Sequence, residues 1–149
     1  MGILWGLPNL KDLDTQYIES KLRPHVPVPG QQAFPKLQTL RIWPDPEDTV
    51  NPTELWTWIM TLVRSGGRQL ESFCLDERKR RLAIPFLKAN IRDLALSIDS
   101  LKKLLIGDTL IALDNVTLIS ESFPMLEELA ITVTKVHIVR LIYNCVRLR

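Results

Sequence analysis

The 149-residue sequence has few of the residues that build metal centres and disulfide frameworks. Its two cysteines, Cys74 and Cys145, lie far apart and form no C-x-x-C pair, so neither a disulfide framework nor a zinc site is indicated. The two histidines, His25 and His137, have no His, Cys or carboxylate neighbour at metal-ligand spacing. We therefore expect no metal and no cofactor.

Catalytic signatures are also missing from the sequence. No serine lies in a G-x-S-x-G context, and Gly66-Gly67 is followed by Arg-Gln rather than by the Lys-Ser of a phosphate-binding loop. Glu127 and Glu128 are adjacent, and adjacent strand residues point to opposite sides, so they do not form an acid–base pair. We expect a protein that is not an enzyme, with no catalytic residues and no small-molecule substrate.

The sequence contains no apolar run of transmembrane length and no secretory signal. A net charge of +2 is too small to indicate a nucleic-acid or membrane partner. Together with the cysteine usage, this predicts a cytoplasmic or nuclear location. The basic run Arg-Lys-Arg-Arg at residues 78–81 fits a nuclear localisation signal, a phosphate-binding patch or a solvated loop, and the sequence leaves these open.

What the sequence does contain is a repeated pattern. FPKLQTLRI at residues 34–42 and FPMLEELAI at residues 123–131 share the form F-P-x-L-x-x-L-x-I, and related segments begin at residues 7, 68, 91 and 145. The anchoring residues are Leu10, Leu37, Leu70, Ile91, Leu126 and Leu148, at steps of 27, 33, 21, 35 and 22 residues. Leucine-rich repeats run about 20–29 residues per unit, and the steps of 33 and 35 residues exceed this range.

The pattern predicts parallel strands at residues 37–43, 70–75, 91–98 and 126–133, neighbouring one another in chain order. Helices are expected at residues 51–63, which Asn51 caps, at 85–90 and at 134–144, with loops at 23–33 and 44–51. Residues 99–113 contain a further L-x-x-L-x-I, so this segment is either an extra repeat or a helix.

Alternation of strands and helices predicts an α/β fold with a parallel sheet. Thr39, Arg41 and Trp43 alternate with apolar residues, so one face of the sheet is expected to be wet. This favours a solenoid, with strands on the concave face, over a doubly wound sheet. We expect one domain over residues 1–149, with about five units and a truncated sixth.

The segments LPNLKDL, FPKLQTLRI, RQLESFCL, FPMLEELAITV and NCVRLR resemble those of leucine-rich repeat proteins, and more narrowly the irregular repeats of fungal F-box proteins. The resemblance implies a protein–protein recognition module, the substrate-reading part of a ubiquitin-ligase adaptor. The chain departs from the family in two ways: no F-box is present, and the asparagine expected after each strand is replaced, for example by Asp45, Asp99 and Thr134. The alternative interpretation is a truncated solenoid fragment with no independent activity.

Template positions that point outward should line up in columns across successive units. The predicted partner-binding residues on this concave face are Thr39, Arg41, Trp43, Ser72, Cys74 and Asp76. An exposed Trp beside an Arg has the composition of an interaction hot spot, although packing of Trp43 under the loop that follows it is the alternative.

Overall fold

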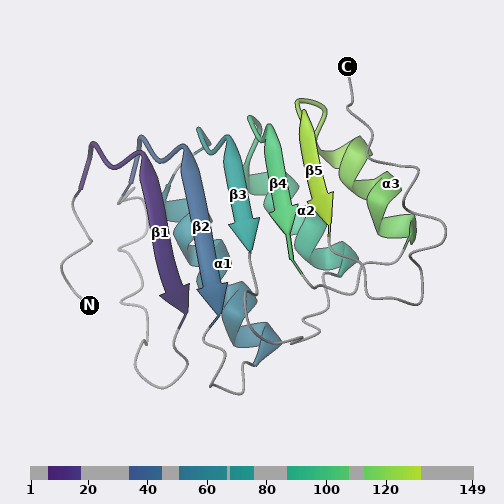
Figure 1. Ribbon diagram of the computed structural model, residues 1–149, viewed down its shortest axis with the longest axis horizontal. Helices are drawn as coiled ribbons and strands as arrows, with labels where there is room; N and C mark the ends of the chain where they lie inside the picture. Colours follow the sequence, from purple (N-terminus) through teal and green to yellow (C-terminus); the bar gives the residue numbers. More distant parts are fainter. Residues whose placement is uncertain are drawn as a thin grey trace.

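The computed structural model describes residues 7–17, 34–44, 51–66, 68–75, 87–107 and 113–131, and these residues build a parallel sheet backed by helices (Figure 1). The strands are β1 (Asp12–Tyr17), β2 (Thr39–Pro44), β3 (Ser72–Leu75), β4 (Lys103–Ile106) and β5 (Glu128–Ile131), and the helices are α1 (Pro52–Ser65), α2 (Lys88–Ser97) and α3 (Leu113–Ser122). The five strands pair in chain order, and every described pairing is parallel. The α/β fold and the strands expected around residues 37–43 and 70–75 are confirmed. The strand expected at 126–133 is confirmed as β5 up to Ile131, the last described residue.

The strand predicted at residues 91–98 is wrong, because most of this segment lies in α2. Ile91 and Leu94 are three residues apart, which places them on one side of a helix, and both are buried. The L-x-x-L spacing suits both structures, so the template alone did not separate them. The helix expected at residues 85–90 is correspondingly longer and begins at Lys88.

The fourth strand lies in the segment that the sequence left undecided. β4 joins β3 and β5, with Phe73 opposite Leu104 and Leu104 opposite Leu129. With this correction the anchors are Leu10, Leu37, Leu70, Leu101 and Leu126, at steps of 27, 33, 31 and 25 residues. The units are thus more even in length than the sequence pattern suggested. The expected loop at 23–33, the helix at 134–144 and the sixth unit lie outside the described residues. Of the loop expected at 44–51, Pro44 is the last residue of β2 and Asn51 is the N-cap of α1, whereas residues 45–50 are not described.

The repeated F-P-x-L motif forms a turn at the start of a strand. The amide of Leu37 donates to the carbonyl of Phe34 (3.1 Å), and the amide of Leu126 donates to that of Phe123 (3.0 Å). Proline occupies the second position of both turns, where its fixed φ is favourable. The repeated motif therefore forms a turn that directs the chain into the following strand.

A second device fixes each strand against the preceding one. The carbonyl of Lys11 accepts hydrogen bonds from two successive amides, those of Gln38 (2.8 Å) and Thr39 (2.9 Å). The same pair of distances recurs at three further carbonyls. That of Gln38 accepts from the amides of residues 71 and 72, that of Glu71 from those of 102 and 103, and that of Lys102 from those of 127 and 128. All four junctions of the sheet thus start in the same way.

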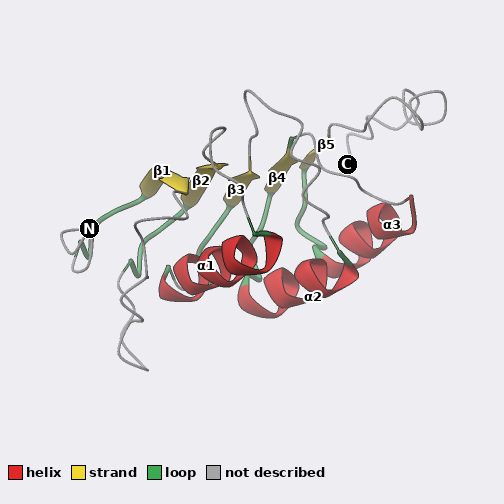
Figure 2. Ribbon diagram, turned by 90° about the horizontal axis from the view of Figure 1, so that it is seen from below, coloured by secondary structure: helices red, strands yellow, loops and turns green. Residues whose placement is uncertain are grey.

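The core lies between the sheet and the helices, all three of which pack on one face of the sheet (Figure 2). Inward strand residues such as Leu40, Phe73 and Leu104 are 0% exposed. In α1, the side chain of Asn51 accepts from the amide of Thr53 (3.0 Å), as the capping pattern predicts. The buried side of α1 contains the expected apolar residues Leu55, Trp58, Ile59 and Leu62.

Gly66, which follows α1, allows a close approach to Leu37 at the start of the same unit. A Cβ atom at this position would lie 2.9 Å from Cδ2 and 3.2 Å from Cβ of the fully buried Leu37. Its φ of −83° is open to any residue, so the expected cost of Gly66→Ala is steric. We expect a loss of about 1–3 kcal/mol in the free energy of unfolding, measured by urea denaturation. Arg64→Ala, at an exposed position of α1, is the control and should change stability by less than about 0.5 kcal/mol. Equal effects would show that the approach to Leu37 is not tight.

Candidate functional site

The candidate site is the sheet face opposite the helices, which none of the described helices covers (Figure 2). The strand pairing aligns the outward residues in two columns that cross all five strands. The first contains Asp12, Thr39, Ser72, Lys103 and Glu128, and the second contains Asp14, Arg41, Cys74, Leu105 and Ala130. We call this surface the open face. In the columns expected from sequence, Asp93 and Ala95 occupied the places of Lys103 and Leu105, because residues 91–98 were taken for a strand.

The open face brings together five of the six predicted site residues. Thr39, Arg41 and Trp43 lie on β2, and the pairing sets Thr39 opposite Ser72 and Arg41 opposite Cys74 on β3. Arg41 is exposed, whereas Thr39, Trp43 and Ser72 are half-buried. The sixth residue, Asp76, lies outside the described residues.

Cys74 occupies the expected outward position but is only 8% exposed. Its neighbours on the two adjacent strands are Arg41 and Leu105. A partner would therefore meet the larger side chains on either side before it meets the thiol.

Arg41 and Trp43 are organised by Asp14 of β1. The indole Nε1 of Trp43 donates a hydrogen bond to Oδ1 of Asp14, and Nη1 of Arg41 lies 3.7 Å from Oδ2 of the same carboxylate. Cζ of Arg41 lies 5.6 Å from the centroid of the Trp43 ring, within the range of a cation–π interaction. Asp14 was not among the predicted site residues. The signal that finds it is its template position, one unit before Arg41.

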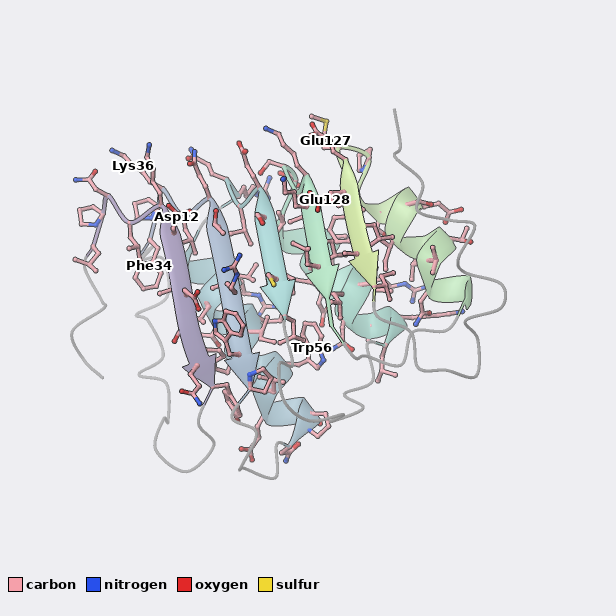
Figure 3. All side chains as sticks on the ribbon, in the orientation of Figure 1. Asp12, Phe34, Lys36, Trp56, Glu127 and Glu128 are labelled. Atoms are coloured by element: carbon pink, nitrogen blue, oxygen red, sulfur yellow. The ribbon has the colours of Figure 1, made fainter. Side chains whose placement is uncertain are left out.

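Charged pairs lie farther across the sheet, at the beginnings of β3, β4 and β5. Nζ of Lys103 is 3.0 Å from Glu128, and Nζ of Lys102 is 3.1 Å from Glu71. Figure 3 shows Asp12, Lys36, Glu127 and Glu128 along this same edge of the sheet. Pairs this exposed contribute about 0–1 kcal/mol to stability, so their main effect is on the charge pattern that a partner meets.

A hollow of about 370 Å³ lies between α1 and α2 on the helical side of the molecule. Trp56 and Met60 of α1 line it, together with Leu87 from the start of α2. The side-chain hydroxyls of Thr57 and Thr61 donate to carbonyls of α1 itself, 2.8 Å away. No predicted site residue lines this hollow.

The described residues offer no group of three or more His, Cys, Asp or Glu side chains that could hold a metal ion. None of the helices in this part of the chain is long and apolar enough to cross a bilayer.

The described residues form an α/β fold with a five-stranded parallel sheet in chain order and three helices on one of its faces. Comparison of the chain with protein-family models, curated proteins and solved structures finds no match. The resemblance to leucine-rich repeat proteins therefore rests on the repeated sequence template and stays a prediction.

Proposed function

We propose that the chain is a leucine-rich-repeat-like solenoid that recognises a protein partner through its open face. The observation that carries this proposal is the cluster of Asp14, Arg41 and Trp43. It holds an aromatic ring and a guanidinium in a fixed relation, with 45% of the Arg41 side chain accessible. Trp and Arg are the residues that most often supply binding energy at protein interfaces.

The resemblance to fungal F-box proteins extends the proposal to a cellular role. In such a protein the repeats bind the substrate of a ubiquitin ligase. We propose that this chain has the same substrate-binding role, in the cytoplasm or the nucleus. The open face supports it because outward strand positions from successive units form one continuous surface there.

The proposal is tested by capturing partners from a eukaryotic lysate with the tagged chain. Proteins that bind through the open face should be retained by the wild type and reduced at least tenfold by Arg41→Glu and by Trp43→Ala, since each change removes a central anchor. The control is Arg92→Glu, which makes the same charge reversal at an exposed position of α2 on the helical side. Retention of the same proteins by the two open-face variants, with loss in the α2 variant, would assign binding to the other side.

One observation favours the alternative of a solenoid fragment without independent activity. Leu129 and Ile131, the inward residues of β5, are half-buried, whereas their counterparts Leu104 and Ile106 on β4 are 0% and 1% exposed. The core is thus less covered at β5 than at β4. If the chain captures no protein whose retention depends on Arg41 and Trp43, this alternative is preferred.

A further inference from the structure

The side chain of Arg41 keeps most of its hydrogen-bonding capacity for a partner. A guanidinium has five N–H donors. Within the described part of the chain, its closest charged contact is the 3.7 Å approach to Asp14, which is longer than a hydrogen bond. Lys103 differs, because its Nζ lies 3.0 Å from Glu128. Arg41 is therefore oriented by Trp43 and Asp14 without being saturated by them.

Charge on the open face is divided between its centre and its margins. At the described outward positions of β2, β3 and β4 there are two cations, Arg41 and Lys103, and no carboxylate. The carboxylates are on the outermost strands, Asp12 and Asp14 on β1 and Glu128 on β5. A negatively charged group is thus best placed over the centre, reaching Arg41 from the β3 side, away from Asp14.

Beyond Arg41, the outward residues of the same column are uncharged and mainly apolar. The next residues in its column are Cys74, Leu105 and Ala130, one from each successive strand. Leu105 is half-buried on this outward face, so part of its side chain is accessible to a partner. The column therefore combines one cation with a short apolar row.

We infer that the partner of the open face presents an extended acidic–apolar segment, with a carboxylate on Arg41 and an apolar side chain on Leu105. This inference rests on the proposed function. The two residues are separated by two strand spacings, ~9.6 Å. That matches the ~9.3 Å between residues i and i+3 of a polyproline II segment, whose side chains repeat on the same side every three residues. The complementary sequence is thus an Asp or Glu followed, three residues later, by an aliphatic residue.

The test uses the full chain, labelled with ¹⁵N, and three blocked peptides: acetyl-Glu-Pro-Pro-Leu-amide and its variants with Gln or Lys in place of Glu. We expect the Glu peptide to shift the indole resonance of Trp43 in a saturable manner. It should bind about tenfold more tightly than the Gln peptide, because a charged hydrogen bond is lost in the latter. The Lys peptide should bind most weakly. Arg41→Gln should make the Glu and Gln peptides equivalent, whereas Arg41→Lys should keep part of the preference for Glu.

Arg92→Gln, on the helical side, should leave all three affinities unchanged. Spectra of the unbound variants report whether the fold is retained. Equal binding of the Glu and Gln peptides to the wild type, preference for the Lys peptide, or no binding of any peptide would each overturn the inference. If partners captured from lysate still depend on Arg41 and Trp43 while the peptides fail, the proposed function stands with a partner of different chemistry. If the capture also fails, both are overturned.

Discussion

Phe73→Ala is expected to lower the free energy of unfolding by about 3–5 kcal/mol, measured by urea denaturation. The side chain is 0% exposed on the central strand, and its register neighbours are Leu40 and Leu104, both also fully buried. Removal of the ring leaves a cavity in the middle of the core, where backbone on both sides is tied into the sheet and cannot easily collapse. The loss is therefore placed at the upper end of the range for core truncations.

The matched control is Ser72→Ala, one residue earlier on the same strand. Ser72 faces outward and is half-buried, so its truncation should change stability by less than about 0.5 kcal/mol. If the two variants lost similar stability, the assignment of inward and outward faces on β3 would be wrong.

Leu104→Ala is expected to cost about 2–5 kcal/mol, whereas Leu105→Ala should cost about 1 kcal/mol or less. The two leucines are consecutive, and the substitution is identical, so differences in strand propensity largely cancel. Leu104 is 0% exposed and faces the helices, while Leu105 is half-buried on the open face. Thermal or urea unfolding of both variants tests the strand that replaces the one expected at residues 91–98. Equal losses would contradict β4 as described.

The residues that were predicted correctly are those whose pattern has one physical meaning. At residues 34–42, a proline turn precedes strict alternation, and only a strand satisfies both. At residues 51–65, an Asn cap, an early proline and apolar residues on one side specify a helix in the same unambiguous way.

The prediction failed where one spacing serves two structures. Ile91 and Leu94 fit the strand template, yet they also lie on one side of a helix, and both are buried in α2. The contact that marks the true start of this unit lies just before β4. The hydroxyl of Ser100 donates to the carbonyls of Arg68 (2.8 Å) and Leu70 (3.2 Å), contacts about 30 residues away that no local pattern reveals. α3 was not predicted from the sequence.

The candidate site was only partly predictable for the same reason. The alternation that exposes Arg41 and Trp43 is local, so both were found. Their contact with Asp14 depends on the pairing of β1 with β2, across more than 20 residues of chain. The place of Leu105 depended on the correct assignment of β4.

The carbonyls that accept two amides at each junction have a consequence for how the chain tolerates changes in length. Each strand is positioned at its start, by hydrogen bonds to the carbonyl of the residue that precedes the neighbouring strand. The sheet therefore does not fix the number of residues between the end of a strand and the following turn. Steps of 25 to 33 residues coexist with one constant junction. An extra residue between the end of a strand and the next turn merely lengthens a connection. The same insertion between Leu37 and Leu40 would turn every later side chain of β2 to the opposite face, burying Arg41 and exposing Ile42.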